Sequence, residues 1–212
     1  MDNPADSATS DLAPTLARLR AAWQQRKPDH AQRRGDLQRL RDALKGRLDE
    51  MADAIAADFG HRSKDESRIA DGMTVLNDID HLLKHLRGWM KPQKVRTPIF
   101  LQPASAMIQR QPLGVVGVIA PWNYPVQLAL APAITALAAG NRVMLKPSEL
   151  TPHTSAQLGI LISQFFTPDE VCVVQGDAAV AQAFSALPFD HLVFTGSTAV
   201  GRKVAQVAAA NL

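Results

Sequence analysis

The 212-residue sequence has one cysteine, one tyrosine and no long hydrophobic run. The single cysteine, Cys172, excludes an internal disulfide framework and is typical of a protein in a reducing compartment. The most apolar stretch, residues 126–139, contains Gln127, Pro132 and Thr135 and is too short to span a bilayer. The first residues have neither the basic nor the apolar region of a signal peptide, so we expect a cytoplasmic protein without a membrane partner.

Neither sign of charge is in large excess. The 23 lysines and arginines against 20 aspartates and glutamates give a net charge of +3. From Arg18 to Arg47, however, there are ten basic residues and only three acidic ones. This run could attract phosphate or an anionic partner, but it lacks the series of aromatic side chains on which bases stack. We interpret it as the solvated face of two helices and expect no nucleic-acid partner.

The first part of the chain has the periodicity of helices. Apolar residues recur at spacings of three and four in three series, over residues 12–23, 37–59 and 69–90. Gly60 follows the second series where a left-handed helix cap is usual, and residues 63–66 fit a capping box before the third. The predicted apolar stripe of the third series is Ile69, Met73, Leu76, Ile79, Leu83, Leu86 and Met90.

The pattern changes at Pro92. The short β-prone pieces 99–101 and 106–108 follow, in a stretch that also holds Pro98 and Pro103. We expect this stretch to form extended strands or an arm that leaves the globule.

After Gly114 the pattern becomes regular, with short apolar runs and helical segments in alternation. Four β-then-α repeats with short connections predict an α/β fold, a doubly wound, Rossmann-like parallel sheet. Strands are expected at 115–120, 142–145, 171–174 and 192–194, and helices at 126–139, 153–166, 178–186 and 199–210.

These patterns divide the chain into four parts. We expect a disordered tail at residues 1–10 and a helical segment at 11–91 that packs on the domain after it. The arm follows at 92–113, and an α/β domain at 114–212. Because ligands of such a sheet bind at the carboxyl ends of its strands, the loops after the strands are the candidate functional segments.

The loop after the fourth strand resembles a phosphate site in its chemistry. Gly196 and Ser197 lead directly into a helix, whose first N–H groups and dipole favour an anion. Gly196 allows close backbone approach, and the Ser197 hydroxyl can donate a further hydrogen bond. The alternative is that Ser197 is only an N-cap and Gly201 only a packing residue.

The loops after the first two strands carry further polar residues. Lys146 and Glu149 could hydrogen-bond ribose hydroxyls, and the carboxylate would repel a 2′-phosphate. The alternative is a surface Lys–Glu pair worth little. Asn123 lies between aromatic residues and a proline, so its amide could serve as a fixed donor to an oxyanion, or could merely satisfy a turn. The neighbouring Trp122 offers an indole N–H to a phosphate or a carbonyl.

Four segments together, in this order and at these separations, closely resemble the aldehyde dehydrogenase superfamily. They are PWNYP at 121–125, AAGNRVMLKPSE at 138–149, QGD at 175–177 and FTGSTAVGRKV at 194–204. The wider stretch from Phe59 to Val204 looks most like the coniferyl aldehyde dehydrogenase branch.

The resemblance implies an NAD(P)-dependent oxidoreductase that converts an aldehyde into a carboxylic acid. NAD is the expected cofactor, with NADP as the alternative, and a homodimer or tetramer is expected, with no metal. Asn123 matches the family's oxyanion-stabilising asparagine. The implied cofactor-binding residues are Trp122 and Ser197 near the pyrophosphate, Lys146, Ser148 and Glu149 around the adenosine ribose, Gly176 on the adenine side, and Gly196 and Gly201 in the nucleotide loop.

Members of the family continue well beyond 212 residues, with a general-base Glu on the next strand and a nucleophilic Cys in a later domain. Their reaction, as the resemblance implies, passes through a thiohemiacetal on that cysteine, hydride transfer to nicotinamide and hydrolysis. Cys172 lies in a predicted strand, where we expect a small hydrophobic thiol with a raised pKa. We therefore expect an incomplete sheet, an inactive chain and self-association.

Two interpretations of different classes stay open. The chain is a piece of an active oxidoreductase, or it is a non-catalytic nucleotide-binding or structural module. Asn123 favours the first, because a module without catalysis has no use for it. A third interpretation, an adaptor for an anionic partner, requires the basic residues between Arg18 and Arg47 to gather on one surface.

Overall fold

A four-stranded parallel sheet forms the centre of the molecule, in a computed structural model that describes residues 11–211. The tail predicted at residues 1–10 lies outside the described residues. The strands lie in the order β5-β4-β3-β6, so the order reverses between β3 and β6. The predicted parallel sheet is confirmed, with strands β3 (Val115–Ile119), β4 (Arg142–Lys146), β5 (Val171–Val173) and β6 (His191–Phe194).

The register brings the carboxyl ends of β3, β4 and β6 to one edge of the sheet. Ile119 at the end of β3 pairs with Lys146 of β4 and with Phe194 of β6. The connecting helices lie within two residues of their predicted bounds. They are α7 (Gln127–Ala139), α8 (Pro152–Phe165), α9 (Ala178–Ser185) and α10 (Thr198–Ala208), followed by the short 3₁₀ turn η3 (Ala209–Asn211).

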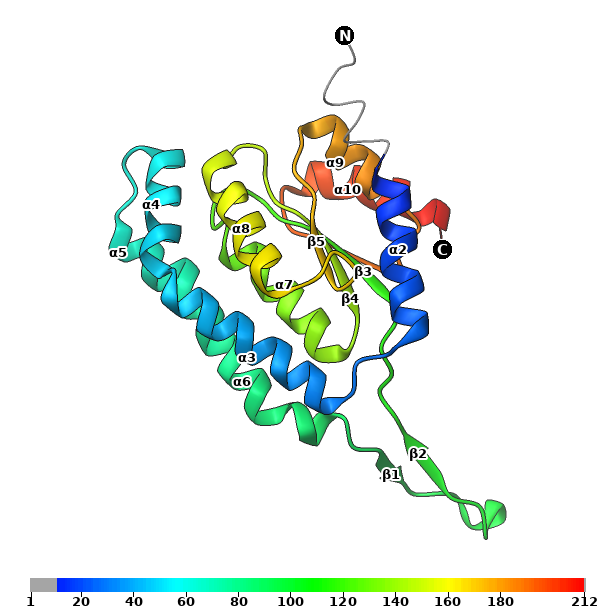
Figure 1. The fold of residues 1–212 in the computed structure, drawn as a ribbon. Helices are drawn as coiled ribbons and strands as arrows, with labels where there is room; N and C mark the ends of the chain where they lie inside the picture. Colours follow the sequence, from blue (N-terminus) through cyan, green and yellow to red (C-terminus); the bar gives the residue numbers. More distant parts are fainter. Residues whose placement is uncertain (1–10, 212) are drawn as a thin grey trace.

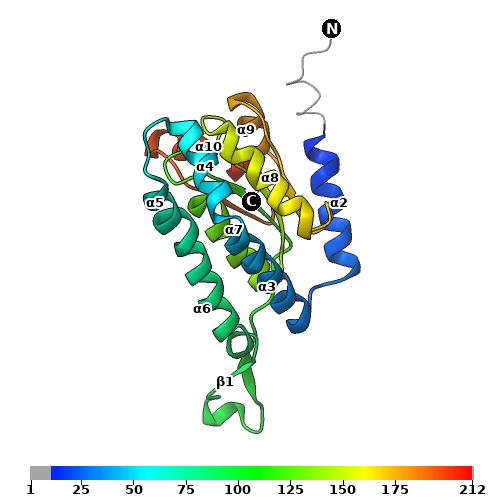
Figure 2. The ribbon, with the colours of Figure 1, turned by 60° about the vertical axis from the view of Figure 1, so that its left-hand side comes forward.

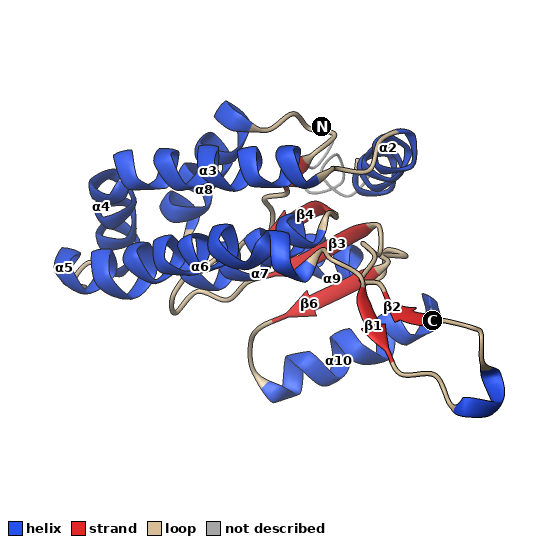
Figure 3. Cartoon of the chain, turned by 90° about the horizontal axis from the view of Figure 1, so that it is seen from below, coloured by secondary structure: helices blue, strands red, loops and turns tan. Residues whose placement is uncertain are grey.

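Helices lie on both faces of the sheet (Figures 1 and 3), and the central strands β3 and β4 are buried between two hydrophobic cores. Val116 and Val118 of β3 face a large core formed with α3, α4, α6, α7 and α8. Val115 and Ile119 of the same strand face a smaller core formed with α2 and α9. Each strand residue therefore enters one layer or the other by the alternation of a β-strand, and both faces are apolar because both are covered.

The helical segment that precedes the sheet contributes to both layers. Its elements are α2 (Leu12–Gln25), α3 (His30–Gly46), α4 (Leu48–Phe59), α5 (Lys64–Ser67), the π-helix η1 (Arg68–Met73) and α6 (Thr74–Trp89). Within this segment, α2 covers the face of the sheet that α9 also covers, and α3 to α6 stack over α7 and α8 on the other face (Figure 2). The basic residues between Arg18 and Arg47 are thus divided between helices on opposite faces, and many pair with acids, such as Arg41 with Asp80.

Two features of the helical prediction are wrong in detail. The second apolar series forms two helices instead of one, because the backbone of Arg47 is not helical, with φ −122° and ψ 17°. In the third series, Ile69 and Met73 are 61% and 49% exposed. The π-helix rotates this turn so that Asp71 and Gly72 face inward in their place. The two predicted caps are present: Gly60 has φ 74°, and Ser63 Oγ accepts from the N–H of Glu66 at 3.5 Å.

The segment after α6 is a hairpin that projects away from the domain (Figures 1 and 2). Strand β1 (Gln93–Val95) pairs antiparallel with β2 (Ala106–Ile108). The prediction of a strand at Ile99–Leu101 is wrong, because these residues form a 3₁₀ turn, η2, at the tip. Pro98 begins that turn and its carbonyl accepts from the N–H of Leu101 at 3.0 Å.

No helix in the described range 11–211 has the length and apolar character needed to cross a membrane.

Candidate functional site

A cleft of about 540 Å³ lies at the carboxyl edge of the sheet. It is placed where the strand order reverses, between β3 and β6, which is the usual ligand position in an open parallel sheet. The loops after β3, β4 and β6 line it together with α9 and α10. Five residues singled out in the sequence meet there: Trp122, Ser148, Glu149, Gly196 and Ser197.

The N-terminus of α10 forms one wall of the cleft. Ser197 is the N-cap, and its Oγ accepts from the N–H of Val200 at 3.4 Å. The capping role considered above is therefore present, but Ser197 is exposed, and its hydroxyl proton is not used in that hydrogen bond. The first turn of α10 also presents backbone N–H groups that have no partner within the helix.

The two glycines of this loop pack against one aromatic ring. A Cβ on Gly196 would approach the ring of Phe194 to 2.6 Å, and a Cβ on Gly201 would approach it to 3.3 Å. Phe194 is the last residue of β6 and also lines the cleft. Gly196 therefore allows the backbone to lie close to the strand end, and Gly201 allows the first turn of α10 to pack there.

Lys146 and Glu149 form a pair that is not a surface pair. Lys146 is 1% exposed, and its Nζ donates to the carbonyl of Pro147 at 2.8 Å and to Glu149 Oε2 at 3.3 Å. Burial lowers the pKa of Lys146, and the Glu149 carboxylate acts in the opposite direction. Glu149 is exposed at the cleft, whereas Lys146 is not among the residues that line it. The buried Lys146 thus orients the Glu149 carboxylate through a hydrogen bond from outside the cleft.

A smaller hollow of about 160 Å³ adjoins the cleft and shares Ser148 and Glu149 with it. It adds Gln175 and Gly176 from the loop after β5. Gly176 has φ 152°, and a Cβ there would lie 2.6 Å from the side chain of Val180. The fold therefore requires this glycine for its backbone and for its contact with α9. Ser148 is 7% exposed, and its carbonyl accepts from Ser155 Oγ at 2.8 Å.

The loop after β3 carries the exposed residues Trp122 and Asn123. The Trp122 ring lies 5.9 Å from that of Phe59, between centroids. Asn123 does not line the cleft, and its side-chain amide has no hydrogen bond to any other residue of the described range. The backbone of the loop is held instead, since the Asn123 carbonyl accepts from Arg62 Nη1 at 2.7 Å.

Two residues around this loop were not found from the sequence. Arg62 lies 3.9 Å above the Phe59 ring, and Asp71 Oδ1 accepts from the N–H groups of Val126 and Gln127, each at 3.0 Å. Burial raises the pKa of Asp71, and the two backbone hydrogen bonds oppose that shift. Asp71 lies outside the predicted apolar stripe and faces inward because of the π-helix, so the helical periodicity gave no signal for it.

Cys172 lies in β5, half-buried against the smaller core. Burial raises the pKa of its thiol. Within the described range 11–211, no three His, Cys, Asp or Glu side chains are grouped so as to hold a metal ion.

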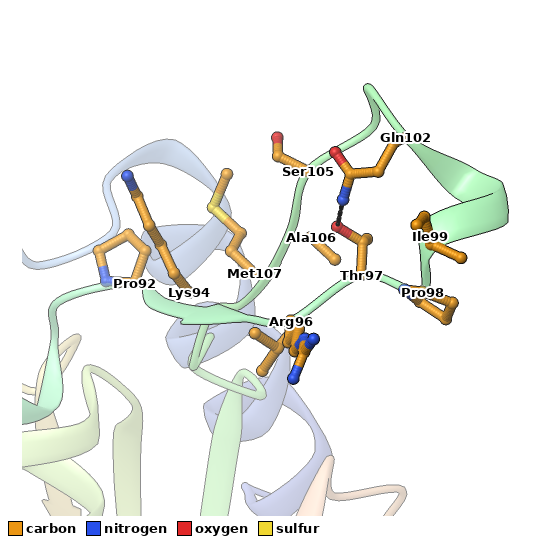
Figure 4. A pocket seen from close by; sticks show the side chains of 11 residues that line it. Pro92, Lys94, Arg96, Thr97, Pro98, Ile99, Gln102, Ser105, Ala106 and Met107 are labelled. Carbon is orange, nitrogen blue, oxygen red and sulfur yellow. Dashed lines mark hydrogen bonds between the residues drawn. The ribbon is translucent and has the colours of Figure 1, made fainter.

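A larger hollow of about 1240 Å³ belongs to the hairpin (Figure 4). All of its lining residues come from 92–107, and one side-chain hydrogen bond crosses it, from Gln102 Nε2 to Thr97 Oγ1 at 3.2 Å. It is the concave side of an isolated hairpin, and it contains none of the catalytic or cofactor-binding residues that the sequence predicts.

Comparison with known proteins agrees with the fold. The model of the aldehyde dehydrogenase family matches residues 4–212. The chain belongs to the aldehyde dehydrogenase family. The resemblance noted from the four segments is therefore confirmed, and members of this family are oxidoreductases that act on aldehydes with NAD(P).

Several family members with curated names are similar over nearly the whole chain. The probable coniferyl aldehyde dehydrogenase of Pseudomonas aeruginosa is 48% identical over 204 residues, which cover 96% of this chain and 43% of that protein. The coniferyl aldehyde dehydrogenase of a Pseudomonas species is 42% identical over 213 residues, which cover 99% of this chain and 44% of that protein. The chain thus spans less than half the length of these relatives.

Solved structures of aldehyde dehydrogenases show the same fold. The substrate-bound AldH of Staphylococcus aureus superposes with a TM-score of 0.90 at 34% identity, over 93% of this chain and 43% of that one. A betaine aldehyde dehydrogenase from the same species, in complex with NAD+, has a TM-score of 0.85 at 24% identity, over 96% of this chain and 42% of that one. The second likeness supports the fold alone.

Proposed function

We propose that the cleft between β3 and β6 is the NAD(P) site of an aldehyde dehydrogenase, and that NAD is the preferred cofactor. The observation that carries the proposal is that three loops and the N-terminus of α10 meet at the switch point of the sheet. In a protein of the length of the relatives, this site would serve the oxidation of an aldehyde to a carboxylic acid. The single free cysteine agrees with a cytoplasmic setting.

The residues at the cleft fit a dinucleotide. The exposed first turn of α10, with the Ser197 hydroxyl, suits a pyrophosphate, because its N–H groups and dipole attract an anion. Glu149 Oε2 is already oriented by Lys146 and can accept from the hydroxyls of a ribose. Trp122 also lines the cleft, and its indole N–H can donate to the cofactor. The bound NAD would supply the hydride acceptor.

Asn123 would act on the substrate side. Its amide is exposed and has no partner in the described part of the chain, so it is free to donate to a carbonyl oxygen that gains negative charge. Cys172 does not serve as the nucleophile in this proposal, because it is half-buried in β5 and its thiol has a raised pKa. The 212-residue chain would therefore bind the cofactor without oxidising an aldehyde.

The relatives named as coniferyl aldehyde dehydrogenases suggest an aromatic aldehyde as substrate. The exposed hairpin at residues 92–113 would be an oligomerisation arm, as in a homodimer or tetramer, because Ile99 and Phe100 at its tip are 87% and 81% exposed.

Calorimetric titration with NAD and NADP tests the cofactor assignment. The wild-type chain should bind NAD more tightly than NADP, because the Glu149 carboxylate repels a 2′-phosphate. Glu149→Gln should lose most of this preference, and Gln182→Glu, a new carboxylate elsewhere in the cleft, should leave it in place. Binding of neither nucleotide would contradict the proposal, as would formation of NADH from coniferyl aldehyde by this chain alone.

A further inference from the structure

A buried carboxylate holds the end of the loop that carries Trp122 and Asn123. Asp71 is 1% exposed, and its Oδ1 accepts from the N–H groups of Val126 and Gln127 at 3.0 Å each. The helix α7 begins there without a side-chain cap from its own N-cap residue. Asp71 therefore caps α7 from another element, and its negative charge matches the positive end of the helix dipole.

An arginine holds the middle of the same loop. Arg62 Nη1 donates to the carbonyl of Asn123 at 2.7 Å. Its guanidinium lies 3.9 Å above the ring of Phe59 and 5.1 Å from that of Tyr124, in each case from the ring centroid. The side chain is 13% exposed, so this contact is made in a mostly dry environment.

The two holding residues belong to one network. Arg62 Nη1 lies 4.0 Å from Asp71 Oδ2, and that oxygen has no hydrogen-bond partner among the described residues. Phe59, beneath the guanidinium, also packs against the Trp122 ring. The loop is therefore fixed through its backbone and through the contact of Trp122 with Phe59. The polar atoms of the Trp122 and Asn123 side chains form no hydrogen bond with the other described residues.

We propose that Arg62 and Asp71 are positioning residues that fix the backbone of the loop and so set the directions of the Trp122 indole and the Asn123 amide. The role of this positioning in catalysis rests on the proposed function. A donor that stabilises an oxyanion must be held in place before the charge develops. Lysine cannot replace Arg62, since a planar guanidinium both stacks on Phe59 and donates to the carbonyl.

Nuclear magnetic resonance of the ¹⁵N-labelled chain tests the inference directly. In Asp71→Ala the amides of Val126 and Gln127 should exchange with solvent about tenfold faster or more, because each loses an acceptor from a charged group. Asp71→Asn keeps an acceptor and should exchange much more slowly than Asp71→Ala. In Arg62→Met the Trp122 indole and Asn123 amide signals should shift or broaden, and Arg62→Lys should not restore them.

Arg68→Met is the matched control. The Arg68 side chain is 37% exposed and pairs with Asp49 and Asp65 rather than with the loop, so its loss should leave these signals unchanged. Unmoved loop signals in both Arg62→Met and Asp71→Ala would overturn the inference. Changes spread evenly over the sheet would also overturn it, because they would mean a general loss of stability.

The wild-type NAD titration separates this inference from the proposed function. If NAD does not bind but the loop signals respond as expected, the cofactor assignment fails and the positioning role stands. If NAD binds and the loop signals do not respond, only the positioning role fails.

Discussion

At the scale of single residues, burial decides the chemistry of Lys146 more than its charge partner does. The ammonium group is 1% exposed, 3.3 Å from one carboxylate oxygen, and its pKa is nevertheless lowered. Lys146 therefore serves the site by orienting the Glu149 carboxylate. Burying its charged ammonium group lowers the stability of the folded chain.

This lowered pKa predicts that the stability difference between the wild type and Lys146→Met depends on pH. The folded-state pKa of Lys146 lies below its ordinary value of 10.5, so between those two values the unfolded chain binds a proton that the folded chain has released. The free energy of unfolding of the wild type, minus that of Lys146→Met, should therefore rise with pH through this window. Urea unfolding at a series of alkaline pH values measures the difference. A flat difference would mean that the pKa is not lowered by folding.

Some residues of the site could be predicted from the sequence, and others could not. Ser197, Glu149 and Trp122 were found because each lies just after a strand, and the edge of a parallel sheet collects such residues. Arg62 and Asp71 were missed because their partners lie 61 and 55 residues away in the sequence. Local patterns carry no information on contacts between distant segments.

At the scale of elements, the ends of the helices are set by individual glycines and long side chains. Gly140 ends α7 with φ 92°, and Arg33 of α3 donates from Nη1 to the carbonyl of Ala139 at 2.8 Å. A Cβ on Gly140 would clash with the Arg33 guanidinium. The end of α7 is therefore joined to α3 through one interaction that needs a glycine.

Two glycine substitutions should have opposite effects on stability. Gly140→Ala should lower the free energy of unfolding by about 1–2 kcal/mol, because alanine disfavours a positive φ and displaces Arg33. Gly35→Ala is the control, since Gly35 is exposed inside α3 with open space around it. It should raise stability by about 0.5–1 kcal/mol. Equal effects in urea unfolding would contradict this account of the α7 end.

Most elements could be predicted because their periodicity agrees with their final environment. The strand β3 is a continuous apolar run, and β4 has three apolar residues between Arg142 and Lys146; every residue of both strands is buried. The π-helix was missed, since Ile69 and Met73 fit an ideal helical stripe that the wide turn then rotates outward. The β-propensity of Ile99–Leu101 predicts an extended strand within a projecting arm, whereas in the structure Pro98 begins a 3₁₀ turn there and its carbonyl accepts from the N–H of Leu101.

At the scale of the whole molecule, exposed large apolar side chains are most numerous on the hairpin, and others lie elsewhere, such as Ile69 and Leu150. The hairpin exposes Ile99, Phe100 and Met107, at 87%, 81% and 61%. The helix α10 has no buried residue, and its Val200 is 49% exposed. Groups of apolar side chains of this kind are typical of surfaces that contact another chain or another part of the same chain.

The hairpin should therefore drive self-association. Sedimentation velocity of the wild-type chain should show species larger than a monomer at high concentration. Ile99→Ser together with Phe100→Ser should shift the distribution toward monomer, whereas Ile160→Ser, on the exposed side of α8, should not. A wild-type chain that stays monomeric at high concentration would contradict the role of the arm.

The central claim concerns where the nucleotide binds, and a shift-mapping experiment tests it most directly. NAD is titrated into the ¹⁵N-labelled chain and the backbone amide shifts are followed. The cleft at the switch point predicts that Glu149, Gly196 and Ser197 shift together with one dissociation constant, while the strands of the hairpin do not move. Shifts confined to the hairpin, or NAD binding that leaves Gly196 and Ser197 unmoved, would contradict the account.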